Sequence, residues 1–143
     1  ADGCTIKGMR LSGRVVDGAK VLTEEQKTAL AKELALLEAR TQHQLVVATA
    51  SSLEGLPIEE YGLCQARRWG IGRKGVDDGV LLLVAPRDRK VRIEVGYGLE
   101  KPLRDDEAAN IVRMMLPSFE QSRYFEGIQA GTRGIAAEIG STQ

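Results

Sequence analysis

The sequence of 143 residues lacks the features that mark several large classes of protein. Lysine plus arginine total 20 and aspartate plus glutamate total 20, so the formal net charge is zero. Aromatic residues make up only 4% and no basic stripe is interleaved with them, so we expect no nucleic acid as a partner. The longest apolar run is about as long as one β-strand, far short of the roughly 20 residues of a membrane span. We therefore expect no transmembrane segment in this chain.

Cysteine and histidine are also scarce. Cys4 and Cys64 have neither the number nor the spacing of a zinc site. They are either two separate thiols, which is the simpler interpretation and the one we favour, or a disulfide, which would indicate an oxidising compartment. His43 is the only histidine, and no nucleophile motif accompanies it, so we predict a surface residue without a catalytic role.

The length suits one domain with a single core. Residues 1–12 show no periodicity and are predicted to be a flexible tail, and residues 13–143 are predicted to be a single domain. The expected strands are an edge strand at 13–17 and strands at 44–50, 79–85 and 90–95. The first expected helix runs from the capping box at Thr23 to Arg40 or Thr41, and a second follows Pro57. A third helix is capped by Asp105 and is kinked or interrupted by Pro117 near Met114, and a fourth lies at 124–139. Strands 44–50 and 79–85, with a helix between them, predict a right-handed parallel βαβ unit.

The stretch at 75–101 is the one around which we expect the chain to be organised. The all-apolar run 79–85 predicts a buried strand, residues 86–89 carry turn chemistry, and 90–95 alternates as a half-exposed strand does. A hairpin that pairs Ala85 with Lys90 sets Asp78 opposite Tyr97. The residues then expected at one rim of the sheet, or just beyond it, are Asp77, Asp78, Tyr97, Glu100, Asp105 and Asp106. Converging carboxylates repel unless they share a cation or a proton, so this rim is the candidate site.

Residues 70–75 match the dinucleotide fingerprint G-x-G-x-x-G by letter. That fingerprint functions between a strand and the start of a helix, whereas here it follows a predicted helix and precedes a strand. We therefore expect no dinucleotide, and a loop whose carbonyls can turn towards a cation near Asp77 and Asp78.

Several short stretches, taken in order, resemble the TPM domain family from Arg14 to about Ile139. They are VVD at 15–17, LTEE at 22–25, QLVV at 44–47, RWGIG at 68–72, DDGVLLL at 77–83 and RIEVGYGLE at 92–100. The resemblance implies a three-layer α/β/α sandwich with a mixed sheet of about four strands, in agreement with the pattern of elements. It also implies a divalent cation, calcium in some members with magnesium or manganese as alternatives, and an extracytoplasmic location such as the periplasm.

The resemblance assigns roles to particular residues. It implies Asp78 and Glu100 as the best metal ligands and Asp17, Asp77 and Asp105 as weaker ones. Asp78 and Asp77 are the candidate catalytic residues, and Lys101, which stands where the family has glycine, joins Arg73 and Lys74 as a candidate phosphate-binding group.

Two functions remain open from the sequence. The first is metal-dependent hydrolysis of a phosphorylated substrate, because a plant member of the family is regarded as an acid phosphatase. The chain has no Cys-x5-Arg loop, Asp-x-Asp pair or histidine cluster of its own. The second is a non-catalytic calcium-binding module that assists assembly or repair of a membrane-protein complex. A third reading is that these carboxylates only cap helices and stabilise turns.

Overall fold

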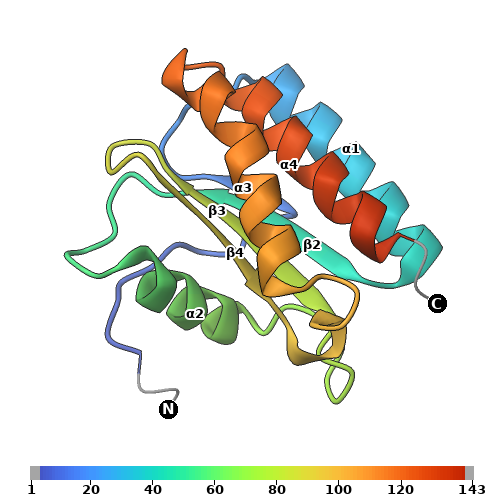
Figure 1. The fold of residues 1–143 in the computed structure, drawn as a ribbon. Helices are drawn as coiled ribbons and strands as arrows, with labels where there is room; N and C mark the ends of the chain where they lie inside the picture. Colours follow the sequence, from blue (N-terminus) through green and yellow to red (C-terminus); the bar gives the residue numbers. More distant parts are fainter. Residues whose placement is uncertain (1–3, 141–143) are drawn as a thin grey trace.

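The computed structural model describes residues 4–140, which form a mixed four-stranded sheet between two layers (Figure 1). The strands are β1 (Val15–Asp17), β2 (Gln44–Thr49), β3 (Gly79–Ala85) and β4 (Lys90–Val95), in the spatial order β1-β2-β3-β4. β1, β2 and β3 run parallel, and β4 pairs antiparallel with β3. This architecture confirms the predicted α/β/α class and the parallel βαβ unit.

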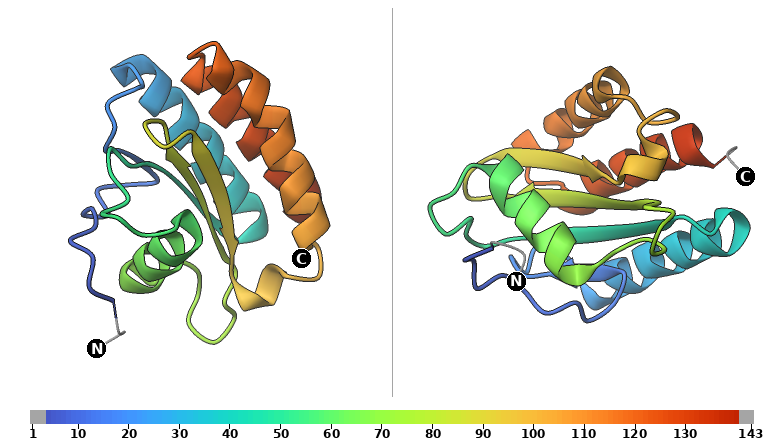
Figure 2. Two further views of the ribbon diagram at one scale, coloured as in Figure 1. Left: turned by 60° about the vertical axis from the view of Figure 1, so that its left-hand side comes forward. Right: turned by 90° about the horizontal axis from the view of Figure 1, so that it is seen from below.

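Helices cover the two faces of the sheet unequally (Figure 2). α1 (Glu24–Thr41), α3 (Asp105–Glu120) and α4 (Tyr124–Ile139) lie on one face, and α2 (Ile58–Trp69) lies on the other. The three-helix face holds the larger core, in which Leu30, Leu34, Ile128 and Ile135 pack against β2 and β3. None of the helices within residues 4–140 is long and apolar enough to span a membrane.

Local sequence explains where the main elements begin. The Thr23 side chain accepts the Gln26 amide at 3.1 Å while the Gln26 side chain accepts the Thr23 amide at 2.9 Å, so the predicted capping box starts α1. Every residue of β3 is buried, because helices cover both faces of this central strand.

The hairpin register is the predicted one. Ala85 is paired with Lys90 and Val80 with Val95, and the Gly96 amide donates to the Gly79 carbonyl at 2.8 Å. Because the ladder continues past the strand ends, the chain before Gly79 and the chain after Val95 leave the sheet together.

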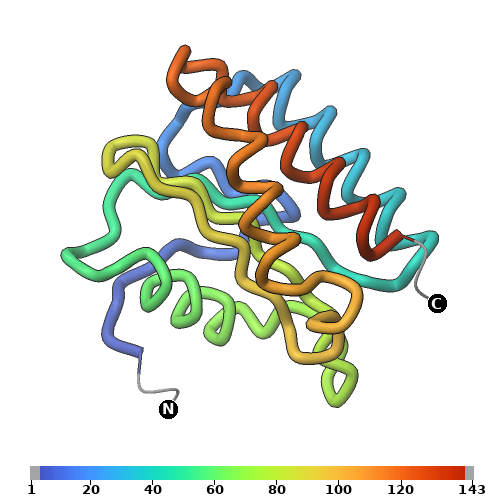
Figure 3. The backbone as a smooth tube through the Cα atoms, in the orientation of Figure 1, coloured from blue at the N-terminus to red at the C-terminus, as the bar shows by residue number. Residues whose placement is uncertain are grey.

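The prediction of separate thiols was wrong, because Cys4 and Cys64 form a disulfide with their Cα atoms 5.5 Å apart. Sequence alone could not pair two cysteines 60 residues apart. Residues 4–12 contain no helix or strand, and they pass beside α2 (Figure 3), where Ile6 is buried in the smaller core. The Trp69 ring nitrogen donates to the Met9 carbonyl at 2.7 Å, and the Arg68 guanidinium donates to the Ile6 carbonyl at 2.7 Å.

Two local predictions on α3 also need correction. Of the two outcomes predicted for Pro117, a kink or an interruption, the interruption was wrong, because the helix runs on to Glu120. Proline removes one amide donor from the helix, and the neighbouring Met115, fully buried in the larger core, holds this last turn by packing. The N-cap is Arg104 rather than Asp105, which lies in the first turn, and the Arg104 amide donates to the Glu107 carboxylate at 2.8 Å.

Candidate functional site

Asp78, the predicted centre of the site, is buried immediately before β3, with only 1% of its surface exposed. Its Oδ1 accepts the Arg73 amide at 2.8 Å. Its Oδ2 accepts the Arg73 side chain at 2.9 Å through Nε and at 2.8 Å through Nη2, and lies 3.0 Å from Nδ1 of His43. Both carboxylate oxygens are therefore engaged within the protein.

These contacts determine the ionisation of Asp78. Burial by itself raises the pKa of its carboxyl, but the hydrogen bonds from the Arg73 side chain and amide, and then from His43, outweigh burial and lower the pKa from 3.8 to about 2. The carboxylate is consequently charged at neutral pH, and His43 carries a proton on Nδ1 in order to donate to it.

His43 is a correction to the sequence prediction, which placed it at the surface. It is buried between the end of α1 and the start of β2, and its amide donates to the Thr41 hydroxyl at 3.1 Å. A lone histidine gives no sequence signal for burial, because its partner Asp78 lies 35 residues away.

Asp17 lies at the opposite end of the sheet from Asp78. It is paired with Thr49 at the C-terminal ends of the parallel strands, whereas Asp78 precedes the N-terminal end of β3. The Asp17 carboxylate accepts the Thr49 hydroxyl at 2.6 Å and the amides of Val21 and Leu22 at 3.1 and 3.0 Å. Asp17 therefore closes the turn into α1 and does not join the other predicted ligands.

Asp77 and Tyr97 do meet at the predicted end of the sheet. This end is formed by the loops at 73–78 and 96–102, which we call the rim. The Gly98 amide donates to the Asp77 carbonyl at 2.9 Å, so the two loops are joined directly. Asp77 adopts a positive φ of 55°, and its side chain is exposed. Tyr97 is 81% exposed and Val76, on the facing loop, is 43% exposed.

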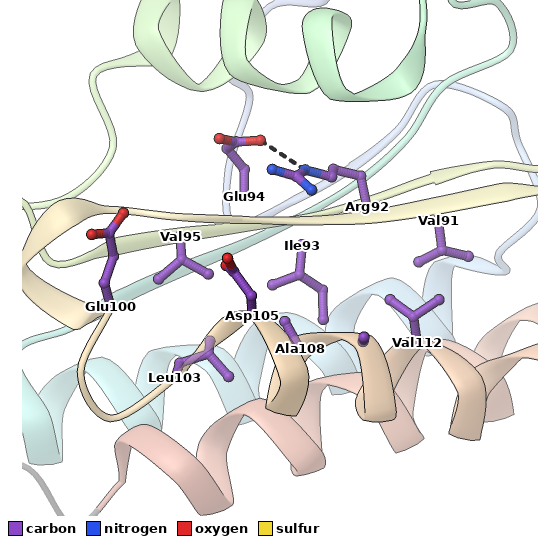
Figure 4. A pocket seen from close by; sticks show the side chains of 11 residues that line it. Val91, Arg92, Ile93, Glu94, Val95, Glu100, Leu103, Asp105, Ala108 and Val112 are labelled. Atoms are coloured by element: carbon purple, nitrogen blue, oxygen red, sulfur yellow. Dashed lines mark hydrogen bonds and ion pairs between the residues drawn. The ribbon is translucent and has the colours of Figure 1, made fainter.

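Glu100 and Asp105 line one pocket between β4 and α3, with a volume of about 280 Å³ (Figure 4). Side chains of Val91, Ile93 and Val95 point from β4 towards α3, while Arg92 and Glu94 point to the opposite face and pair at 3.0 Å. The pocket thus has apolar side chains along its β4 wall and the exposed carboxylates of Glu100 and Asp105 at its rim end, and polar atoms form the larger part of its open surface.

The three predicted phosphate-binding cations are in different situations. Arg73 is committed to Asp78 and also donates to the Gln42 side chain at 2.7 Å. Lys74 and Lys101 are exposed, one on each loop of the rim. Only these two lysines are therefore free of the Asp78 cluster.

The five predicted metal ligands do not fit one ion. Asp17 is at the far end of the sheet, and the oxygens of Asp78 are taken by four hydrogen bonds or ion pairs from Arg73 and His43. Within residues 4–140, no three His, Cys, Asp or Glu side chains are grouped as a metal site. The pair that remains together is Glu100 and Asp105.

The polar residues that sequence reasoning missed all brace the loop before β3. They are His43, Gln42 and Gln44, whose Oε1 accepts the Gly72 amide at 2.7 Å. All three residues lie where α1 ends and β2 begins, and the parallel pairing of β2 with β3 places this junction beside the start of β3. Their contact with the loop before β3 could therefore be predicted only once the parallel register of β2 and β3 is known.

Comparison with known proteins supports this architecture. A family model described as the TPM domain matches residues 15–138. The N-terminal domain of a protein from P. gingivalis, solved by NMR, is similar over 88% of this chain and 83% of its own, with 30% identity and a TM-score of 0.79.

Two more distant structures share the fold. An N-terminal domain from Corynebacterium glutamicum has 14% identity and a TM-score of 0.72, and covers 100% of this chain and 93% of its own. The BA42 protein of Bizionia argentinensis has 18% identity and a TM-score of 0.67, covering 82% and 83%. None of the curated proteins matches the chain.

Proposed function

Because this chain belongs to the TPM domain family, we propose that it is a non-catalytic accessory module that binds a partner protein through its rim. One observation carries this proposal: both oxygens of Asp78, the best candidate for catalysis, are held by Arg73 and His43. The alternative proposal, a metal-dependent phosphatase, needs such an oxygen to attack phosphorus or to hold a metal.

Asp77 is a poor replacement for Asp78 in catalysis. Its side chain is exposed in a tight turn, and its position is fixed through its own carbonyl rather than its carboxylate. A nucleophile needs a neighbouring group that raises its reactivity or orients its target. A carboxylate in solvent has neither, which favours binding over turnover at the rim.

Exposed apolar groups at the rim support docking. Tyr97 and Val76 lie on loops joined by the contact between Gly98 and Asp77, so they form one apolar tip. A Cβ atom on Gly98 would lie 2.0 Å from the Val76 carbonyl oxygen, which explains why this close approach needs glycine. Exposed tyrosines are frequent anchors of protein interfaces because they bury a large area at low entropic cost.

The disulfide supports an oxidising, extracytoplasmic compartment for the module. A membrane-protein complex as the partner is supported by the family resemblance alone. The predicted cation has two remaining ligands, Glu100 and Asp105, and we propose that it binds there weakly, with carbonyl oxygens and water completing its shell.

The test for catalysis measures phosphomonoester hydrolysis by the wild-type domain across pH, with calcium, magnesium, manganese or chelator. Asp77→Asn and Asp78→Asn variants, purified identically, control for contaminants. We expect the same background rate in all three proteins. Metal-dependent turnover that either variant abolishes would establish the phosphatase and overturn the proposal.

Docking and cation binding are tested separately. A photo-crosslinking residue at position 97 should capture a partner in the native cell envelope, whereas the same residue at Leu36, 60% exposed on α1, should not. Equal capture at both positions would contradict rim docking. Calcium titration followed by NMR should shift amides near Glu100 and Asp105 in the wild type, and this response should vanish in the Glu100→Gln/Asp105→Asn variant.

A further inference from the structure

β4 is an edge strand whose outer side is unpaired in the sheet of residues 4–140. In an antiparallel ladder, every second residue directs its amide and carbonyl away from its partner strand. The pair Gly79 and Gly96 is hydrogen-bonded, so the alternation directs the main-chain groups of Val91, Ile93 and Val95 outwards. The Val84 carbonyl, opposite Val91, accordingly points away from β4 towards the β2 side of the sheet, where it accepts the Ala50 amide at 2.8 Å.

The pocket of about 280 Å³ follows this open edge. Its lining includes five consecutive β4 residues, from Val91 to Val95, so the wall is the strand itself. The opposite wall is a stripe on α3 in which Ala108 and Ala109 leave space that larger side chains would fill. A second pocket, of about 350 Å³, continues past Val91 towards the hairpin and is lined there by Leu116.

The helical layer extends beyond the edge of the sheet. Four strands spaced by about 4.8 Å are about 14 Å wide between the outer axes, whereas three helices packed side by side span about 16 to 20 Å. α4 lies between α1 and α3, and the view from below shows α3 beyond β4 (Figure 2). The space beside the open edge of β4 is therefore covered on one side by α3.

The position of α3 decides between two possible binding partners for the β4 edge, a second copy of the chain and a single extended peptide. A second copy of the chain, paired β4 to β4, would bring α3 against α3 of the other copy, closer than the 8 to 10 Å that packed helices need. A single extended segment carries no helix of its own and fits under α3. The edge is therefore suited to a peptide strand and protected from pairing with itself.

Charge indicates the kind of peptide. The groove is apolar beside Val91, Ile93 and Val95, and it ends at the carboxylates of Glu100 and Asp105. On the other face of β4, Arg92 and Glu94 neutralise each other. A complementary segment alternates apolar side chains towards α3 and has a lysine or arginine at the end that reaches the carboxylates.

We propose that the groove between β4 and α3 binds an extended peptide with alternating apolar side chains and a terminal cation, by addition of a strand to β4. Main-chain hydrogen bonds to Val91, Ile93 and Val95 supply affinity, and the groove selects the side chains. In the antiparallel arrangement the cation belongs at the amino end of the peptide. This inference concerns a different surface from the Tyr97 tip and does not depend on docking there. It shares Glu100 and Asp105 with the proposed cation, so peptide binding is measured in the presence of chelator.

The probe is an acetylated and amidated peptide, Lys-Thr-Val-Thr-Val-Thr-Val, added to the ¹⁵N-labelled domain. We expect NMR shifts confined to β4 and α3 and slowed exchange of the Val91, Ile93 and Val95 amides. N-methylation of the central valine removes one donor and should weaken binding at least about fivefold. Replacing lysine by glutamate should weaken binding by a similar factor, and added salt should reduce this second difference.

Protein variants test the same groove from the other side. Val91→Pro removes an outward amide without removing a bond to β3, so it should weaken peptide binding at least about fivefold while thermal unfolding confirms the fold. Asp105→Asn should weaken binding, and Asp106→Asn, one residue along and outside the pocket lining, is its matched control.

Three outcomes of the peptide titration would overturn the proposal. They are no shifts at millimolar peptide, shifts away from β4 and α3, or equal binding of the N-methylated peptide. A concentration-dependent dimer in analytical ultracentrifugation that Val91→Pro abolishes would also overturn it, in favour of a second copy as the occupant. If Val91→Pro does not fold, the N-methylated peptide decides the question alone.

Discussion

The two faces of the sheet are stabilised in different ways. The face under α1, α3 and α4 is covered by three helices and holds the larger apolar core. The opposite face has α2 and an irregular segment at 4–12, and its core is smaller. On that second face the disulfide between Cys4 and Cys64 and side-chain bonds to main-chain carbonyls take the place of a second helix.

The difference shows that either apolar burial or a covalent cross-link can stabilise the layer that covers one face of the sheet. A three-helix layer stabilises by removing apolar surface from water. An irregular segment buries little surface, so its order depends on restricting the unfolded chain and on satisfying its exposed backbone.

Removal of the disulfide should have the largest effect. A cross-link that closes a loop of 60 residues stabilises by about 4 kcal/mol in the chain-entropy treatment. Cys4→Ser, Cys64→Ser and chemical reduction should therefore lower the free energy of unfolding by similar amounts, measured by urea denaturation. A loss below about 1 kcal/mol in all three cases would mean that the segment is held without its cross-link.

Leu34→Ala tests the three-helix face. Leu34 is a fully buried α1 residue in the larger core, so truncation should cost about 3 kcal/mol from lost contacts and the remaining cavity. Combined with Cys64→Ser, the two costs should add, because the residues lie on opposite faces of the sheet. Strong coupling between them would contradict the separation of the faces.

Asp78→Asn tests the junction where the loop after α2 meets the start of β2. The native pKa of about 2 lies below the ordinary 3.8, so the ionised form adds about 2 kcal/mol of stability above pH 4, and this is lost as pH falls from about 4 to about 2. The variant should lose about that amount at pH 7 and show a flatter acid limb in thermal unfolding. Asp88→Asn, at an exposed turn, is the control and should retain the wild-type pH dependence.

Trp69→Phe should have the smallest effect. It removes the hydrogen bond to the Met9 carbonyl but keeps most of the apolar ring, at a cost of about 1 kcal/mol. In the Cys64→Ser background the cost should fall, because the segment is already loosened. An undiminished cost there would show that this bond holds the segment independently of the disulfide.

Much of the fold could be predicted because its signals are local. Three patterns depend only on neighbouring residues: the capping box at Thr23, the apolar run of β3 and the alternation of β4. Together with the turn residues between β3 and β4, they predicted the element order and the hairpin register. The errors at Pro117 and Asp105 concern helix ends, where packing and capping compete within one or two residues.

The candidate site was less predictable because its chemistry depends on distant partners. The hairpin correctly placed Asp77, Asp78 and Tyr97 near one end of the sheet. It could not indicate that Arg73 and His43 already occupy Asp78, or that Asp17 lies at the far end.

The sequence by itself determined the strands and helices, the hairpin that brings the rim together and the resemblance to the TPM family, because each depends on periodicity or on short ordered motifs. Only the tertiary structure decided which carboxylates are exposed and that Cys4 meets Cys64. The physical reason is that hydrogen bonding and burial depend on distances between segments far apart in the chain. Asp78 and Glu100 are both acidic in sequence, yet one is an internal anchor and the other faces an open groove.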